Sequence, residues 1–333
     1  MKLHRILILT ASIMTGLCLV SCHKDDDETL PYLTGAPSFS LPAYGAPGDS
    51  FSFTAKGVTD DDGKDPDGYY WYSTPIKPAK DTSLTYSITL TDTLCTVAVT
   101  CGAYKDGYYS TSTSHQITIV KDGHKGGSIT GLDFDEEKDF IFTDSRDGRE
   151  YWCTTIGGKD WFKENLAFTG AGKAMENCPV TAGVFGMFYS WNEARTACPE
   201  GWRVSSLQDW ADAVSDISDL KYSPKENFYS VAGEFMADIY FNGSKMWEYW
   251  PDVKISGGTG LSIMPSGYAS ILSNGSGKFF SLNEYAVLWT GDEKDEDQGY
   301  YRYIYMEQPD ILVGSADKNS FGASVRCVRD HIE

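Results

Sequence analysis

The sequence predicts a mostly β chain in which a β-sandwich is followed by an α+β domain. Residues 32–120 contain short alternating apolar segments separated by turn residues, which is the strand pattern of a sandwich. The second half adds a segment with helical spacing at about residues 206–218. The chain also has 33 glycines and 21 tyrosines and no long apolar periodic stretch, so short strands and loops are favoured over a helical bundle.

The N-terminus has the features of an export signal that ends at a lipidated cysteine. Lys2 and Arg5 precede the nearly continuous apolar stretch 6–20, which is the charge order of a signal peptide and is too short to span a membrane comfortably. The sequence LVSC at residues 19–22 resembles the bacterial lipobox, which a signal peptidase cuts before the cysteine. We therefore expect the thiol of Cys22 to be acylated, because several acyl chains on one residue give stable membrane attachment.

Residues 22–31 are predicted to be an acidic tether that follows a removable signal peptide, residues 1–21. The sequence KDDD at residues 24–27 resembles the signal that sends lipoproteins of Bacteroidota to the outer face of the outer membrane, although a solvated linker has the same composition. We expect a protein that is lipid-anchored in the outer membrane and exposed on the cell surface. Its first partner is then the membrane itself.

The charge of the chain excludes nucleic acid as a partner. The formal net charge is −19, and it becomes two units more negative when Lys2 and Arg5 leave with the signal peptide. Such a surface lacks the release of counterions on which DNA and RNA binding depends. It favours solubility or cation binding instead.

The segment 32–120 has the strand spacing of a sandwich with six or seven strands. We expect strands at residues 50–54, 69–72, 84–88, 94–101 and 115–120. Their order and the central Tyr-Trp-Tyr strand resemble the immunoglobulin-like and PKD-like modules that bacterial surface proteins use as spacers. The acidic loop 60–68 is interpreted as a solvated turn, because the ligand spacing of a calcium-binding loop is absent. A polar, glycine-rich linker, residues 121–130, follows the sandwich.

Residues 131–333 resemble a known family. Six groups of residues occur in order: DSRDGREY at 144–151, IGGKDWFKENL at 156–166, YSWNEA and ACPEGWRVSS between 189 and 206, GLSIMPSGY at 260–268, LWT at 288–290 and GASVRCVRD at 322–330. They are similar to the successive motifs of the Fibrobacter succinogenes major paralogous domain, FISUMP. The family is associated with a C-type-lectin-like α+β fold and with secreted or surface proteins without a known activity. The resemblance implies that fold here.

The residues of this domain also predict a helix and a core. Ser205 and Gln208 have the spacing of a capping box, and apolar residues then recur at helical spacing, so a helix is expected over about 206–218. Four tryptophans fall at family positions, and we expect them to pack in the core rather than to contact a ligand. They are Trp161, Trp202, Trp247 and Trp289.

Six of the eight cysteines remain available for pairing after export and acylation, and the sequence alone does not choose among the pairings. Cys95 and Cys101 lie on one face of one predicted strand, roughly 20 Å apart, which is too far for a disulfide. We interpret both as buried free thiols.

The remaining four cysteines lie in the family domain. A Cys198–Cys327 bond would close a long loop and stabilise a loop-rich domain by about 4–5 kcal/mol. Cys153–Cys178 is then expected as the second bridge, by elimination.

Two features of the domain are candidates for ligand binding. Tyr249 and Trp250 follow the family residue Trp247, and they offer either a stacking platform for a sugar ring or a packed strand edge. Asp292 and Asp295 lie in an acidic loop that is either a solvated tip or a cation site. Both features fall in the half of the fold where lectin-like domains bind ligands.

No metal, cofactor or catalytic residue is predicted. No CxxC motif or His/Cys cluster indicates zinc. The triplet QPD at residues 308–310 occurs in galactose-type lectins, but the Trp-Asn-Asp strand that completes their calcium shell is missing. The histidines of the mature chain lie in the termini, the linker and the sandwich, so no Ser-His-Asp arrangement is visible, and we expect no enzymatic activity.

These observations predict a non-enzymatic surface lipoprotein. In the first hypothesis it is an adhesin or a glycan-binding protein, with the sandwich as a stalk and the lectin-like domain as a head. In the alternative it is a structural, pilus-associated or envelope-associated component that contacts protein and has no carbohydrate ligand.

Overall fold

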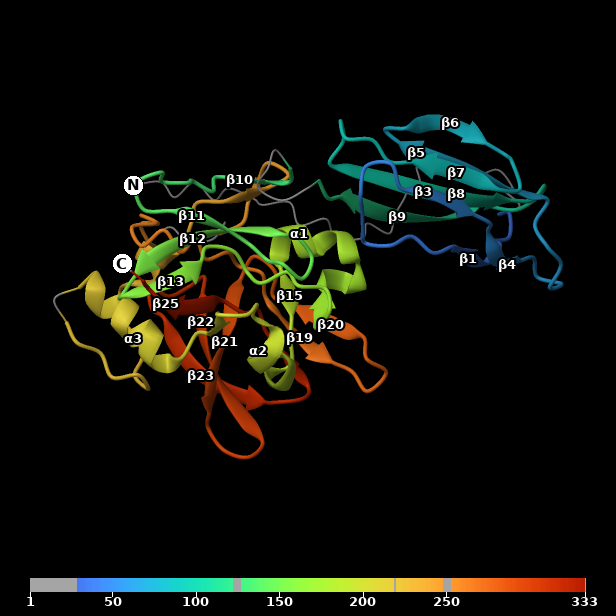
Figure 1. The fold of residues 1–333 in the computed structure, drawn as a ribbon. Coiled ribbons are helices and arrows are strands. Elements are labelled where there is room, and N and C mark those ends of the chain that lie inside the picture. Colours follow the sequence, from blue (N-terminus) through green and yellow to red (C-terminus); the bar gives the residue numbers. More distant parts are fainter. Residues whose placement is uncertain (1–28, 122–126, 219, 248–252, 333) are drawn as a thin grey trace, which may run out of the picture.

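The computed structural model describes residues 29–121, 127–218, 220–247 and 253–332. Strands form 42% of the structure and helices 11%, so the prediction of a mostly β chain is confirmed. Figure 1 shows an elongated N-terminal lobe, residues 29–121, beside a larger C-terminal lobe, residues 127–332. In these described ranges no helix is long and apolar enough to cross a membrane.

The N-terminal lobe consists of two layers of strands around a main core, with a smaller cluster of Leu33, Val58 and Ala103. Its main sheet has the order β2-β9-β8-β5-β6, and the pair β3-β7 packs over it, while β1-β4 forms a second pair. Trp71 lies at the centre, fully buried, and stacks on Tyr86 with ring centroids 5.6 Å apart. The strands are β1 (Thr34–Ser38), β2 (Tyr44–Gly45), β3 (Ser50–Phe53), β4 (Lys56–Thr59), β5 (Gly68–Thr74), β6 (Lys77–Asp81), β7 (Tyr86–Thr89), β8 (Thr96–Tyr104) and β9 (Thr111–Ile119). Each strand expected from the sequence overlaps one of these.

The two cysteines of this lobe differ in their surroundings. Both are free, as expected, and Cys101 is buried in β8. The expectation that Cys95 is buried is wrong, because β8 begins only at Thr96 and Cys95 lies exposed before the strand.

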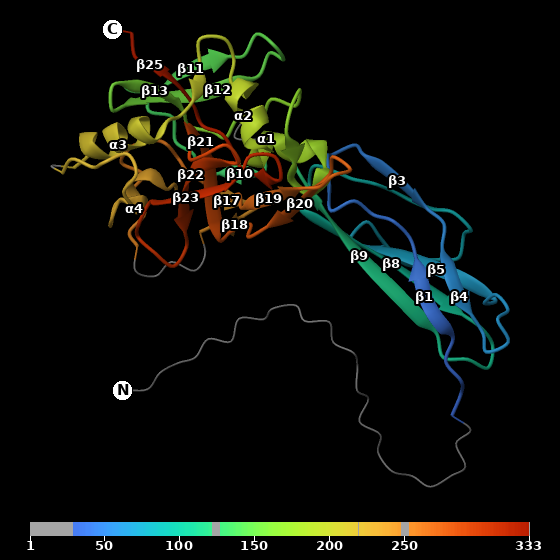
Figure 2. The same ribbon diagram turned by 90° about the horizontal axis from the view of Figure 1, so that it is seen from below.

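The C-terminal lobe is built around a five-stranded sheet, β11-β12-β13-β25-β16, with three smaller three-stranded sheets and the pair β14-β15. Figure 2 shows the lobe from below, with α3 at one side of the sheets and α1 near the N-terminal lobe. The strands are β10 (Ile129–Thr130), β11 (Phe140–Thr143), β12 (Glu150–Ile156), β13 (Lys159–Phe162), β14 (Lys173–Ala174), β15 (Met187–Phe188), β16 (Arg203–Val204), β17 (Tyr240–Phe241), β18 (Ser244–Lys245), β19 (Tyr268–Ile271), β20 (Gly277–Phe280), β21 (Tyr285–Glu293), β22 (Gln298–Tyr305), β23 (Leu312–Asp317), β24 (Phe321–Gly322) and β25 (Cys327–Asp330). The helices are η1 (Met175–Asn177), η2 (Pro179–Thr181), α1 (Ala182–Phe185), α2 (Trp191–Ala197), α3 (Leu207–Asp216) and α4 (Ala232–Phe235).

The predicted helix is α3, and its start differs by one residue from the expectation. Ser206 rather than Ser205 is the N-cap, and its reciprocal partner is Asp209 rather than Gln208. The two side chains satisfy each other's backbone N–H groups, which would otherwise lack partners at a helix start. Trp210 is fully buried on the inner face of the helix.

The five-stranded sheet has a core on each face. Trp161 and Val328 point into one core together with Trp210 of α3. Phe162, which follows Trp161, and Cys327, which precedes Val328, point into the other core. The four family tryptophans are buried, as expected: Trp161, Trp202, Trp247 and Trp289.

Arg326 joins the segments around this sheet. Its guanidinium is fully buried, and it donates to Asn165 Oδ1 (2.9 Å) and to the carbonyls of Phe162 (3.0 Å), Leu261 (2.7 Å) and Ser262 (3.3 Å). Burial lowers the pKa of Arg326 to about 9, so the group stays charged at neutral pH. One buried cation therefore holds the end of β13, the segment 261–262 and the start of β25 together.

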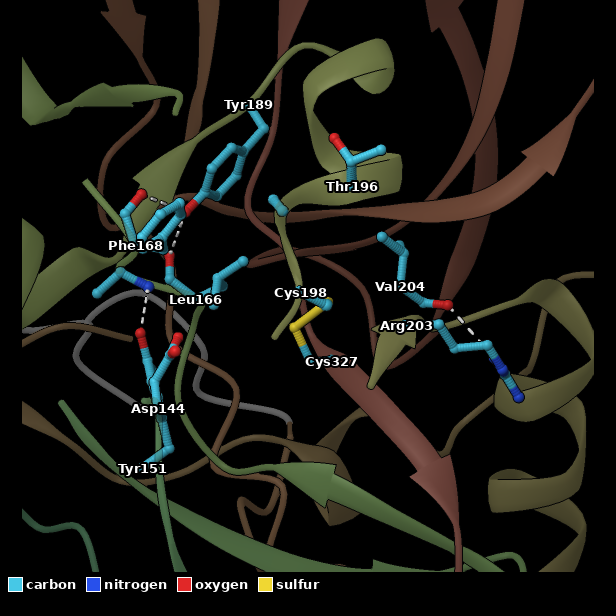
Figure 3. The surroundings of a disulfide bond; sticks show 12 residues. Asp144, Tyr151, Leu166, Phe168, Tyr189, Thr196, Cys198, Arg203, Val204 and Cys327 are labelled. Atoms are coloured by element: carbon cyan, nitrogen blue, oxygen red, sulfur yellow. Dashed lines mark hydrogen bonds between the residues drawn. A yellow bond between two sulfur atoms is a disulfide. The ribbon is translucent and has the colours of Figure 1, made fainter. Parts of the chain in front are cut away.

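The expected disulfide is present. Cys198, directly after α2, is bonded to Cys327 at the start of β25, with Cα atoms 5.8 Å apart. Figure 3 shows the bond beside Tyr189, whose hydroxyl donates to the carbonyl of Phe168 at 3.1 Å. The bond ties the helix to the sheet at the point where Arg326 is anchored.

The second expected disulfide is wrong, since Cys153 and Cys178 are both free. Cys153 points into the core beneath the five-stranded sheet, and its Sγ lies 3.7 Å from the carbonyl of Tyr151. Cys178 lies between η1 and η2, with its Sγ 3.4 Å from the carbonyl of Glu176. Pairing by elimination fails here because a buried thiol packs well as a small apolar residue.

The two lobes meet at the end of β9. Asn242 Nδ2 donates to the carbonyl of Ile119 at 2.9 Å, and Tyr44 packs against Phe185 of α1. Burial raises the pKa of Tyr44 to about 12. The predicted linker ends earlier than residue 130, because Ile129–Thr130 forms β10 and pairs with β17.

Replacing Arg326 with Met tests the importance of the buried cation. The change keeps most of the volume but leaves the amide of Asn165 and three buried carbonyls without their donor, so we expect the free energy of unfolding to fall by about 3 kcal/mol or more. Urea unfolding followed by tryptophan fluorescence measures this loss. The control is Arg195→Met, at a half-exposed side chain, for which a loss below about 1 kcal/mol is expected. Equal losses in the two variants would contradict the role of Arg326.

Candidate functional site

Three of the residues singled out from the sequence lie outside the described residues. They are Cys22, Tyr249 and Trp250. The site is therefore built from the remaining candidates and from the hollows of the described surface.

Asp292 serves the start of a helix. Its Oδ2 accepts the backbone N–H of Leu207, the first residue of α3, at 2.6 Å. A carboxylate at this position satisfies a free N–H group and complements the positive end of the helix dipole. The interaction explains the acidic residue without a ligand.

Asp295 closes the turn between β21 and β22. Its Oδ1 accepts the N–H groups of Asp297 (3.0 Å) and Gln298 (2.8 Å). Lys318, which is buried, donates to the carbonyls of Asp295 and Glu296 across the loop. Asp292 and Asp295 thus have separate structural partners, and no group of three or more metal-ligating side chains occurs among the described residues.

The acidic loop 60–68 of the N-terminal lobe is also closed by its own side chains. Asp60 Oδ1 accepts the N–H groups of Asp62 and Lys64, and Asp60 Oδ2 lies 3.0 Å from the ammonium of Lys105. Asp60 is buried, so this part of the turn is less solvated than expected.

The C-terminal lobe has an aromatic cleft that the sequence reasoning did not find. Its volume is about 300 Å³, and it lies between β19, β21, β22 and β24. We use the name aromatic cleft for the space lined by Tyr268, Tyr285, Val287, Tyr301, Tyr303 and Phe321.

The alternation of side chains along β22 creates one wall of the cleft. Tyr301 and Tyr303 point to the cleft, while Arg302 and Ile304 are buried on the opposite face. Val287 pairs with Tyr303 across the sheet and therefore shares its face. The spacing of three tyrosines at alternate positions, 301, 303 and 305, is the sequence signal that could have revealed this wall.

The rings of the cleft form two stacks, which meet at steep angles where Tyr268 contacts Tyr285 (81°) and Tyr301 contacts Tyr303 (55°). Phe321 stacks on Tyr301 at 5.4 Å and on Tyr268 at 5.5 Å between ring centroids, with interplanar angles of 20° and 21°. Tyr285 stacks on Tyr303 at 6.3 Å. These rings support one another, so the walls keep their shape without a bound ligand.

The chemistry of the cleft is apolar and uncharged, with hydroxyl groups at its edges. None of the six lining residues is an acid or a base with a charge at neutral pH. Burial raises the pKa of Tyr285 and of Tyr301, which keeps both phenols neutral. The hydroxyls of the four lining tyrosines make no hydrogen bond to another described residue, so they are free to donate and accept. Flat apolar faces combined with free hydroxyls suit a ligand with the same two properties.

The family model of the Fibrobacter succinogenes major domain matches residues 154–329, which is more than half of the chain. The chain belongs to this family. The resemblance read from the motifs is thereby confirmed. A comparison with curated proteins finds no match.

A second hollow of the C-terminal lobe is polar, and its lining includes residues before the matched family domain. It has a volume of about 430 Å³ and lies between the loop 131–139, β12 and the glycine-rich segment 255–262. We call it the polar pocket. It shares no lining residue with the aromatic cleft.

Replacing Asp292 with Ala separates the structural role from a cation site. We expect the free energy of unfolding to fall by about 1 kcal/mol, because the N–H of Leu207 loses its acceptor. The control Asp292→Asn keeps an oxygen acceptor and should lose less. Thermal unfolding with and without EDTA measures both effects. A melting temperature that rises with Ca²⁺ in the wild type, but not in Asp292→Ala, would contradict this assignment.

Proposed function

We propose that this protein is a non-enzymatic surface lipoprotein that binds a neutral carbohydrate in its aromatic cleft. The cleft carries the proposal, because sugar rings present apolar C–H faces and a rim of hydroxyls, and the lining tyrosines offer apolar faces and free hydroxyls. No charged side chain lines the cleft, which favours neutral over acidic sugars. A binding role without metal or cofactor is proposed.

The division into two lobes supports the proposal that one lobe is a spacer and the other is a binding head. We propose that the N-terminal lobe is an immunoglobulin-like or PKD-like spacer, since its two layers enclose a main core around Trp71. The C-terminal lobe is proposed to be a C-type-lectin-like head that carries the cleft. The contacts of Asn242 and Tyr44 between the lobes would fix the direction in which the head is presented.

The anchor is proposed from the sequence. Cys22 is the acylated residue, and the acidic tether that follows it holds the two lobes away from the outer membrane. A protein displayed in this way meets extracellular carbohydrate directly.

A glycan panel tests carbohydrate binding. We expect the purified mature chain to bind at least one neutral oligosaccharide, and Tyr303→Ala to weaken this binding about tenfold or more, which corresponds to about 1.4 kcal/mol for the loss of one stacking ring. EDTA should have no effect. The control is Tyr229→Ala, at a tyrosine that is 63% exposed and lies outside the cleft. Absence of glycan binding, or equal affinity in Tyr303→Ala, would reject the cleft as the site and favour a protein-contacting component.

The anchor is tested by localisation. We expect protease treatment of intact cells to digest the wild-type protein, since both lobes lie outside the outer membrane. Cys22→Ser should abolish acylation, measured by fatty-acid labelling, and release the protein from the membrane fraction. A wild-type chain that stays protected in intact cells, but is cleaved after lysis, would contradict surface exposure.

A further inference from the structure

The polar pocket contains a buried ammonium group on its floor. The side chain of Lys163 is only 4% exposed, and its Nζ donates to the carbonyl of Asp133 at 2.7 Å and to the carboxylate of Asp139. An ammonium group has three N–H donors, and these two contacts use two of them. Lys163 lines the pocket, so one donor is left for a ligand.

A buried hydroxyl lies next to this ammonium. Thr154 of β12 is 2% exposed and lines the pocket, and its Oγ1 makes no hydrogen bond to any described residue. Among the described residues, the fully enclosed side-chain groups without a partner are those of Trp71, Arg149 and Arg302, so the hydroxyl of Thr154 is accessible from the pocket and available to a ligand. Its neighbour Thr155 is an ordinary case, because it points to the other face of the strand and donates to Asp160 Oδ1 at 2.9 Å.

Gly260 keeps the space above both groups open. A Cβ atom at this position would lie 3.3 Å from Thr154 Oγ1 and 3.8 Å from Lys163 Nζ. The backbone of Gly260 has φ +71°, which a residue with a side chain adopts only with strain. A side chain here would cover the hydroxyl and the ammonium, so the glycine exposes them to the pocket.

The charges around the pocket select an uncharged ligand. Four carboxylates, Asp133, Asp135, Asp139 and Asp238, line it together with the ammonium groups of Lys138 and Lys163, and the carboxylates would repel an anion that approached Lys163. A cation would in turn meet the ammonium of Lys163 on the floor. A neutral polyhydroxylated molecule suits both the ammonium group and the carboxylates, because each of its hydroxyls can accept from Lys163 and donate to a carboxylate. The volume of about 430 Å³ accommodates one sugar ring.

We infer that the polar pocket is a second carbohydrate site, which takes a single neutral monosaccharide unit through Thr154 Oγ1 and the free N–H of Lys163. This inference does not rest on the aromatic cleft, since the two hollows share no residue. Thr154 is the decisive residue because no protein group uses its hydroxyl.

The test is Thr154→Val, which keeps the shape of the side chain and removes only the hydroxyl. The probes are free glucose, galactose, mannose, xylose and N-acetylglucosamine at millimolar concentrations, followed by saturation-transfer NMR and calorimetry with the full mature chain. We expect at least one of them to bind the wild type, and Thr154→Val to weaken this binding about fivefold or more, as the loss of one hydrogen bond implies. The melting temperature of unliganded Thr154→Val should equal or exceed that of the wild type, because no protein hydrogen bond is lost.

Thr155→Val is the matched control, since it removes a hydroxyl from the adjacent residue on the opposite face of β12 and loses a protein hydrogen bond instead. It should lower the melting temperature and leave monosaccharide affinity unchanged. The inference is overturned if none of the probes binds, or if Thr154→Val binds them as the wild type does. Binding that is lost in Tyr303→Ala and kept in Thr154→Val would assign the sugar to the aromatic cleft and also overturn it.

Discussion

The C-terminal lobe depends on a buried positive charge whose hydrogen-bond acceptors, among the described residues, are all uncharged, while the nearby carboxylate of Glu164 favours its charged form. Arg326 is fully buried and is held by three backbone carbonyls and the amide oxygen of Asn165. Burying a cation is costly unless its donors are satisfied, and here the acceptors come from segments far apart in the sequence. The free energy of burying the cation is offset only when all of these segments are in place, so Arg326 couples their positions. The adjacent disulfide of Cys327 adds a covalent tie at the same point.

Each hollow is positioned by a buried arginine, and Arg326 serves the polar pocket. Arg326 donates to the carbonyls of Leu261 and Ser262, which directly follow Gly260. It therefore fixes the C-terminal end of the glycine-rich segment that lines the polar pocket. The aromatic cleft is fixed by a second buried arginine. Arg302 donates to the carbonyls of Glu226 and Pro224, and it thereby holds β22 from the face opposite to Tyr301 and Tyr303. Both hollows are thus held by buried arginines that do not line them.

Much of the fold follows from local patterns, whereas the sites follow from long-range packing. Alternation predicts the strands, and helical spacing predicts α3, because each pattern is complete within about ten residues. The role of Asp292 could not be read in this way, since its partner Leu207 lies in a helix 85 residues earlier. The aromatic cleft needs four strands to meet, and only its β22 wall leaves a local signal. Elimination gave a false Cys153–Cys178 bridge because it treated burial and pairing as equivalent.

The buried polar groups of the two lobes differ in their surroundings. In the described part of the chain, three buried side-chain N–H groups lack a partner, on Trp71, Arg149 and Arg302. Each of these side chains lies against an aromatic ring: Phe39, Tyr151 and Phe228, respectively. A ring face favours a nearby cation, so the two arginines have a structural compensation, and Trp71 packs edge-on against Phe39. Thr154 differs, because its hydroxyl opens into the polar pocket beside the ammonium of Lys163. The three enclosed N–H groups are therefore features of packing, whereas the Thr154 hydroxyl is open to the polar pocket.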